Sequence, residues 1–297
     1  MKKFFFICSF FFIAASGWAQ DMERVYSVLD TLTSPSFNGR GYVGEGDKKA
    51  AQYIAKEFST IGLQSFESGS YFQPFTFPIN TFPGKLSLKV DGKYLTAGED
   101  FIVEASSSGL KFKGKACFLD TLIFHDLAAK DRFLKEKCDK NVLVYRAEDL
   151  PKIIKLEDKY LQKFHCFKAY IELHKGKLTA SVSTKQYPRV TFQVLEKSFP
   201  KEASKVEMEV EAKLIDRYNT QNVIGFIPGK EKPDSLIVFT AHYDHLGRMG
   251  KDVYFPGAND NASGISMLLE LAYYYKNKPD AQKYSMVFIA FAAEEAG

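Results

Sequence analysis

The feature that most constrains this fold is a strand–helix–strand pattern late in the sequence. An apolar run, SLIVFTAH (235–242), precedes a helical stretch, ASGISMLLELAYYYKNK (262–278), and a second apolar run, YSMVFIAFAAEE (284–295). Near-continuous apolar runs are typical of central strands covered on both faces, and two strands joined through a helix form a parallel crossover unit. We therefore predict an α/β fold, a three-layer sandwich with a mixed, mostly parallel central sheet.

The N-terminal part predicts two helices on either side of a glycine-rich loop. Residues 22–33 and 48–63 carry apolar side chains at helical spacing, and SPSFNGRGYVGEG (34–46) lies between them. Asp47 is expected to cap the second helix at its N-terminus, and Gly62 is expected to end it.

The middle of the chain has a different character. Short alternating or β-branched runs, such as KLSLKVDG, NVLVYRA and RVTFQVLE, read as strands separated by turns. We interpret residues 84–205 as an inserted β-rich domain with one helix at 126–140. Residues 20–83 and 206–297 would form the main domain, with 206–214 as an exposed strand.

The first residues have the layout of a secretory signal peptide. Lys2 and Lys3 precede an apolar run at 4–15, and the small residues Gly17 and Ala19 follow. We predict a signal peptide at 1–19 and an exported protein, periplasmic or secreted. A membrane anchor is the alternative, but this run is too short to span a bilayer and no later run is long enough, so no stable anchor is expected.

Charge and cysteine content exclude two classes of function. The formal net charge of +4 falls by two, to +2, when Lys2 and Lys3 are removed, and scattered lysines give no nucleic-acid footprint. Three cysteines, Cys117, Cys138 and Cys166, allow at most one bridge and form no CxxC metal motif. No oligomeric state is predicted.

Polar side chains follow both apolar strands of the predicted sheet. His242, Asp244 and His245 follow the first strand, Glu294 and Glu295 follow the second, and Asp260 lies in the loop before the helix. Ligands bind beyond the carboxyl ends of strands in such sheets, so these groups are expected to meet at one rim. The alternative is that they are merely solvated strand ends.

The chemistry that fits this set is metal-assisted hydrolysis. His242 is a candidate ligand, Asp260 a candidate bridge between two ions, and Asp244 a partner for the second ring nitrogen of His242. One of the paired glutamates would ligate and the other would act as general base. HExxH, GxSxG, Walker and post-strand GxGxxG motifs are absent from the sequence.

The motifs AHYDHLG, PGANDNASG and AAEE, in this order and spacing, resemble the secreted di-zinc aminopeptidases of metallopeptidase family 28. The resemblance covers roughly residues 22–83 and 215–297, and 84–205 is weakly similar to a protease-associated insert. It implies two Zn²⁺ ions, with His242 and Glu295 each ligating one and Asp260 bridging both. It further implies Glu294 as the base, Asp244 as the partner of His242, and a cis peptide after Asp260.

The function that this resemblance implies is that of a zinc-dependent exopeptidase, an aminopeptidase acting on peptide substrates through a metal-bridged water. Carboxypeptidases and glutaminyl cyclases share the ligands, and a non-catalytic, receptor-like binding protein of the same fold is a further alternative. Zn, Co or Mn suits such ligands. Family members add an Asp and a His ligand beyond the paired glutamates, so a chain ending at Gly297 is expected to be an inactive fragment.

Overall fold

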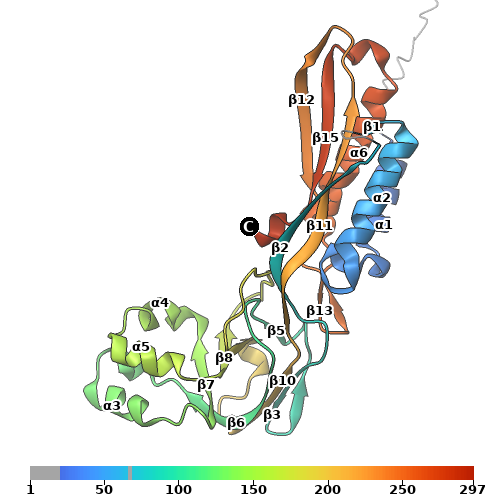
Figure 1. The fold of residues 1–297 in the computed structure, drawn as a ribbon. Helices are drawn as coiled ribbons and strands as arrows, with labels where there is room; N and C mark the ends of the chain where they lie inside the picture. The colour runs from blue at the N-terminus through green and yellow to red at the C-terminus, as the bar shows by residue number, and fades with distance from the viewer. Residues whose placement is uncertain (1–20, 66–68) are drawn as a thin grey trace, which may run out of the picture.

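The structure is a computed structural model, and it describes residues 21–65 and 69–297. The predicted signal peptide at 1–19 lies outside these residues. Two lobes are visible in Figure 1, one built on a five-stranded sheet and the other on an eight-stranded sheet. Within the described residues, no helix has the length and apolar character needed to cross a bilayer.

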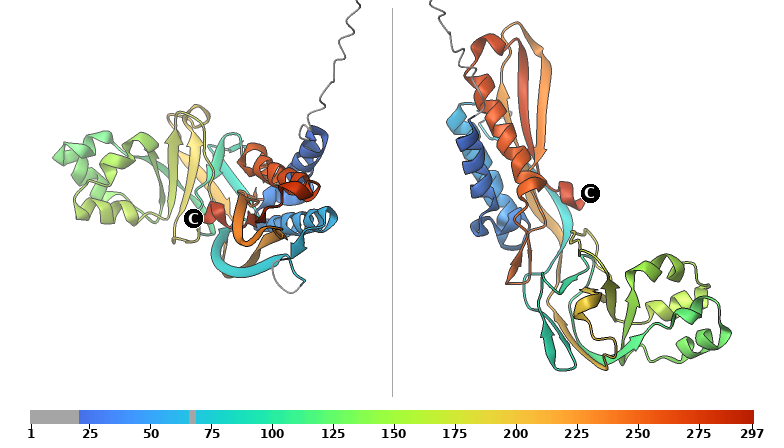
Figure 2. Two further views of the ribbon diagram at one scale, coloured as in Figure 1. Left: turned by 90° about the horizontal axis from the view of Figure 1, so that it is seen from above. Right: turned by 180° about the vertical axis from the view of Figure 1, so that it is seen from behind.

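The first lobe has a mixed sheet with helices on one face. In Figure 2 the three helices lie on the same side of the sheet. The strand order is β1-β11-β15-β12, and β2 also pairs with β11. The strands are β1 (Gln64–Ser65), β2 (Phe72–Thr81), β11 (Lys213–Ile227), β12 (Lys232–His242) and β15 (Tyr284–Phe291), and the helices are α1 (Met22–Thr33), α2 (Gly46–Ile61) and α6 (Ser263–Lys276).

The predicted crossover unit is present. β12 and β15 are parallel, with Val238 opposite Val287 and His242 opposite Phe291, and α6 connects them. Apolar positions of α6 such as Leu268 and Leu269 are buried in one core with Phe288 of β15. This packing explains why the apolar spacing of the helix matches the apolar runs of the strands.

Two details of the sheet differ from the prediction. Only β12·β15 is parallel among the four pairings of this sheet's described strands, so the sheet is mixed but mostly antiparallel. β12 pairs only with β15, and it is an edge strand in this part of the chain rather than a covered central strand. Leu236 and Val238 are consequently 55% and 48% exposed.

The start of α2 corrects the predicted cap. Glu45, in a left-handed conformation with φ 56°, occupies the N-cap position, and Asp47 lies inside the first turn. The Asp47 carboxylate is fully buried and accepts hydrogen bonds from Tyr218 Oη at 2.7 Å and Thr220 Oγ1 at 2.9 Å. Gly62 ends the helix with φ 83°, as predicted.

The second lobe is built on a sheet with the order β4-β3-β10-β6-β7-β8-β9-β5, in which β6, β7, β8 and β9 are mutually parallel. Its strands are β3 (Leu86–Val90), β4 (Lys93–Leu95), β5 (Phe101–Val103), β6 (Leu110–Phe118), β7 (Asn141–Arg146), β8 (Ala169–His174), β9 (Val190–Leu195) and β10 (Lys205–Val210). A short pair, β13 (Arg248–Met249) and β14 (Val253–Tyr254), lies outside both sheets.

This lobe has more helix than the sequence predicted. Instead of one helix it has three among the described residues: α3 (Leu127–Lys135), α4 (Leu150–Ile153) and α5 (Asp158–His165). They cover a core around Phe133, Phe164 and Phe167. The two additional helices were missed because both are short, and α5 is mostly polar outside its buried face.

The segment 206–214 was expected to be an exposed strand of the main domain, but β10 lies between β3 and β6 in the second sheet. Val206, Met208 and Val210 face its core and are buried. The change from one sheet to the other therefore falls between β10 and β11, several residues after the predicted boundary.

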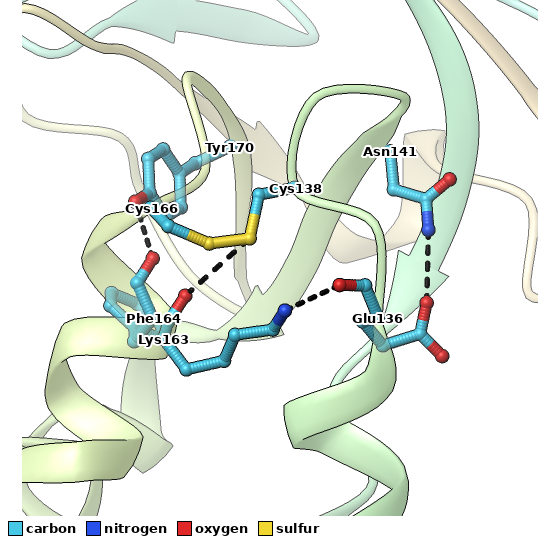
Figure 3. Close-up of a disulfide and its surroundings, with 7 residues drawn as sticks. All are labelled: Glu136, Cys138, Asn141, Lys163, Phe164, Cys166 and Tyr170. Carbon is cyan, nitrogen blue, oxygen red and sulfur yellow. Dashed lines mark hydrogen bonds between the residues drawn. A yellow bond between two sulfur atoms is a disulfide. The ribbon is translucent and has the colours of Figure 1, made fainter.

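One disulfide joins two helices of the second lobe. Cys138 lies after α3 and bonds to Cys166 at the end of α5 (Figure 3). Cys117 is free. Lys163 also links α5 to the end of α3, because its ammonium donates a hydrogen bond to the Glu136 carbonyl. The two cysteines are 28 positions apart in the sequence, so the disulfide closes a loop that contains β7 and α4.

We expect a pH-dependent contribution of Asp47 to stability. Burial raises the pKa of Asp47 to about 6, although hydrogen bonds from Tyr218 and Thr220 oppose the shift. Because the folded protein then holds the proton more tightly than the unfolded chain, this contribution is full below about pH 4 and is lost as the pH rises through about 6. The loss amounts to about 3 kcal/mol.

Urea unfolding of the wild type and Asp47→Asn between pH 4 and pH 7 tests this. The free energy of unfolding of the wild type should fall relative to that of the variant as the pH rises. Parallel pH profiles for the two proteins would contradict the assignment.

The disulfide should stabilise the second lobe mainly by restricting the unfolded chain. Replacing both Cys138 and Cys166 by Ser should lower the free energy of unfolding by about 3 kcal/mol under oxidising conditions. Chemical unfolding with and without a reductant measures this, and the difference from the wild type should vanish when the wild type is reduced. Cys117→Ser, at the free thiol, is the matched control and should respond to the reductant as the wild type does.

Candidate metal centre

The sequence-predicted site residues lie together at the carboxyl ends of two strands. His242 is the last residue of β12, and Glu294 and Glu295 begin the 3₁₀ turn η8 (Glu294–Ala296) just after β15. Asp260 lies in the irregular turn that leads into α6. Because β12 and β15 are parallel neighbours, their carboxyl ends open at the same edge of the sheet.

Imidazole and carboxylate groups face one another in this cluster. Ligand atoms of His242, Asp260 and Glu295 all lie within 4.8 Å of one another. His242 Nε2 is 3.2 Å from Asp260 Oδ1 and 3.8 Å from Glu294 Oε2. The peptide between Asp260 and Asn261 is cis, as the family resemblance implied.

His245 also belongs to the cluster, although neither the residue pattern nor the family resemblance assigned it a role. Its Nδ1 is 2.7 Å from Glu295 Oε1 and 3.9 Å from Asp260 Oδ2. The two oxygens of Asp260 therefore face two different histidines, His242 on one side and His245 on the other. The second histidine of HYDH was the signal that could have identified it.

Asp244 is fully buried and organises the backbone around the cluster. It was predicted to accept from the His242 ring, whose Nδ1 is 3.7 Å from Asp244 Oδ1 and 3.2 Å from the Asp244 carbonyl oxygen. Its Oδ1 accepts from the Glu294 N–H and its Oδ2 from the Glu295 N–H, both at 3.2 Å. This carboxylate thus connects the ends of β12 and β15, and it raises the pKa of His242.

Tyr42 is a residue that sequence reasoning missed. It is buried and its hydroxyl donates to Asp244 Oδ2 at 2.9 Å. Asp244 therefore has three donors, two from the segment after β15 and one from the glycine-rich loop near the N-terminus. Ala293 precedes this segment in a left-handed conformation with φ 61°, which costs about 1–2 kcal/mol and which these hydrogen bonds help to offset.

Arg40 is the second residue that the sequence did not single out. Its guanidinium is fully buried and donates to the carbonyl oxygens of Tyr243, Pro256 and Gly257 at 2.7–2.8 Å. Burial lowers the pKa of Arg40 to about 10, while neighbouring acids such as Asp244 oppose this shift. It therefore stays charged at neutral pH and fixes the loop that carries Asp260.

Gly257 is required by the same loop. Its φ is 59°, and a Cβ there would lie 2.6 Å from Arg40 Nη2 and 2.4 Å from both the Asp260 carbonyl oxygen and His245 Cδ2. No other residue type fits without moving the site. The first glycine of PGANDNASG is thus explained by the close packing of Arg40, His245 and Asp260 around it.

The donor set suits a cation such as Zn²⁺. Imidazole nitrogens and carboxylate oxygens are common zinc ligands, and here they converge with several acids at one rim. Arg40 is buried beneath this rim and its donors are engaged by carbonyl groups, so it does not neutralise the acids by direct ion pairing. A bound cation would relieve the repulsion between these carboxylates.

Comparison with known proteins agrees with this arrangement. Residues 222–297 match the model of peptidase family M28. These residues are therefore similar to that family over about a quarter of the chain. The segment includes every candidate site residue except Tyr42 and Arg40, and both of these hold it from the N-terminal loop.

Curated relatives match mainly through part of their length. The chain is 38% identical over 92 residues to Aminopeptidase YwaD of Bacillus subtilis (strain 168), covering 31% of this chain and 18% of that protein. It is 37% identical over 78 residues to a probable zinc metalloprotease of Pyricularia oryzae, covering 26% of this chain and 15% of that protein. The chain thus aligns with less than a fifth of each relative.

Solved structures show the same fold over nearly the whole chain. A zinc aminopeptidase from Bacillus subtilis, BSAP, superposes with a TM-score of 0.66 at 20% identity over 95% of this chain and 64% of that chain. An aminopeptidase from Aneurinibacillus sp. strain AM-1 gives 0.59 at 19% identity over 94% and 64%. The predicted α/β class is therefore confirmed, although the described helices of the first lobe cover one face of its sheet and not the two faces of the predicted three-layer sandwich. The chain spans about two thirds of these structures' length.

Tyr42→Phe tests whether Asp244 depends on its third donor. Losing a hydrogen bond to a buried carboxylate should lower the free energy of unfolding by about 2 kcal/mol and weaken Zn²⁺ binding about tenfold or more. Chemical unfolding and competition with a chelator measure the two effects. Tyr26→Phe, at a tyrosine that is 58% exposed, is the control and should change neither. Equal behaviour of the two variants would contradict the role given to Tyr42.

Proposed function

We propose that this chain carries the metal centre of a zinc-dependent exopeptidase, an aminopeptidase that hydrolyses the N-terminal residue of peptides. The observation that carries the proposal is the convergence of His242, Asp260 and Glu295, with Glu294 beside them, at one rim of an M28 segment. YwaD and BSAP are both named as aminopeptidases, and this supports the choice among peptidases.

Three residues would hold zinc. His242 and Glu295 would each ligate an ion, and Asp260 would bridge two ions, since its oxygens face opposite histidines. When bound, zinc polarises a peptide carbonyl and lowers the pKa of water. Asp244 would keep the His242 ring oriented and hold the backbone of the paired glutamates.

Glu294 would act as the general base. Its side chain is 59% exposed, so its carboxylate is open to substrate and water, and Oε2 lies 3.8 Å from His242 Nε2. The carboxylate would accept a proton from the attacking water and give it to the leaving amine nitrogen as the peptide bond breaks. Glu295, whose side chain is only 16% exposed and contacts His245, is less suited to this transfer.

Peptides are the proposed substrates. We also propose export to the periplasm or the medium on the basis of residues 1–19, whose lysine pair, apolar run and small residues fit a signal peptide. The bridge between Cys138 and Cys166 supports an oxidising compartment, because such bridges persist there.

Glu294→Gln should separate metal binding from catalysis. In protein expressed from the complete reading frame, this variant should bind zinc as the wild type does but lose at least about a thousandfold in kcat on an aminoacyl nitroanilide. Glu295→Gln is the matched variant and should instead lose zinc. Metal analysis and steady-state kinetics measure both outcomes.

Full activity of Glu294→Gln would reject its role as the base. Activity on N-terminally blocked peptides with none on free N-termini would favour a carboxypeptidase instead. A wild type that binds neither zinc nor peptides would reject the enzyme proposal as a whole.

A further inference from the structure

The second lobe contains a cavity that the proposed chemistry does not use. It has a volume of about 340 Å³ and is lined by residues from α4, α5, β8 and the segment before β9. This size falls in the usual range of ligand pockets. Its lining combines aliphatic and aromatic side chains with a few polar groups, as small-molecule and peptide sites do.

The mouth of this cavity is apolar. Leu150 and Ile154 are 37% and 63% exposed, and Tyr187 is 43% exposed. Large apolar side chains that gather around a concave site mark an interaction surface more often than single exposed residues do. The occupant is therefore expected to carry an apolar group.

The acids of the cavity already have partners. Glu172 accepts from the Tyr145 hydroxyl at 2.8 Å and lies 2.9 Å from His174 Nε2. Glu104 accepts from the N–H and the hydroxyl of Ser106, at 3.0 and 2.7 Å. Neither carboxylate is paired with the one arginine of the cavity lining.

Arg189 lacks a carboxylate partner among the residues that the structure describes. Its Nη1 lies 3.2 Å from His165 Nδ1, and its guanidinium carbon lies 5.2 Å from the ring centre of Tyr187. Burial and the charge of Arg189 both lower the pKa of His165, so this ring is neutral at pH 7 and accepts from the guanidinium. The remaining guanidinium donors suit a planar carboxylate.

The segment that bears Arg189 also packs against the buried cluster that contains Tyr42, the donor to Asp244. Val182, a few residues earlier, packs with Ala296 against one buried cluster that includes Tyr42 and Tyr218. Ala296 directly follows the paired glutamates. The segment that lines the cavity therefore packs against the same buried cluster as the residue that follows the paired glutamates.

We propose that this cavity binds the C-terminal carboxylate of a peptide whose last side chain is apolar. Arg189 pairs with the carboxylate, and the apolar mouth formed by Leu150, Ile154 and Tyr187 covers the side chain. The identity of the occupant as a peptide rests on the proposed peptidase function, whereas the carboxylate and the apolar group follow from the cavity itself.

Calorimetric titration of the full chain tests this with EDTA present, so that no metal contributes. Acetyl-Gly-Gly-Leu as the free acid should bind about tenfold or more tightly than its C-terminal amide. Arg189→Gln should abolish this difference. Arg132→Gln, at an exposed arginine of the same lobe that pairs with Asp120, is the matched control and should preserve it.

A second variant guards against a folding defect. Ile154→Asp, at a position already 63% exposed, should weaken binding of both the acid and the amide while leaving the unfolding transition unchanged. Equal affinity for acid and amide, no binding, or a difference that survives in Arg189→Gln would overturn the proposal. Binding of a fatty acid without binding of the peptide would overturn the peptide as occupant. Because the peptide is blocked and the metal removed, these outcomes are independent of the Glu294 test.

Discussion

The candidate site depends on one buried negative charge, the carboxylate of Asp244. An anion removed from water costs several kcal/mol unless donors replace its hydration, and Asp244 has three. The donors come from the Glu294 and Glu295 backbone and from Tyr42, so one side chain fixes segments that are far apart in the sequence. The positions of the paired glutamates follow from this requirement rather than from the sheet alone.

The buried guanidinium of Arg40 is the positive charge that opposes the acids of the cluster. It holds the loop around Gly257 through carbonyl groups and leaves the acids at the rim without a direct cationic partner. The acidic groups of the cluster therefore outnumber the cation buried beneath them. An arrangement of this kind favours a metal ion at the surface of the site while keeping the supporting loops rigid.

Local patterns predicted the crossover unit and the polar strand ends, because both depend on residues close in sequence. Tyr42 could not be predicted, since its partner Asp244 lies 202 positions away. Burial of 235–242 was overestimated because an apolar run does not say which strands flank it. Asp47 matched a capping pattern, but its carboxylate is buried and accepts hydrogen bonds from Tyr218 and Thr220, which are distant in the sequence. The alternating apolar and acidic residues of 206–214 were interpreted as an exposed strand. The strand is internal to the second sheet, and its glutamates lie on the sheet's outer face.

The paired strands β2 and β11 run from the first lobe to the second, and Figure 1 shows them as the connection between the two. Asn80, in β2, donates from its side chain to the Ala105 and Ser107 carbonyl groups, and its backbone N–H donates to the Ser183 carbonyl. The connection is thus a hydrogen-bonded ribbon anchored at its far end, not a pair of independent tethers. Any tilt of one lobe against the other must shear this ribbon or bend both of its strands together.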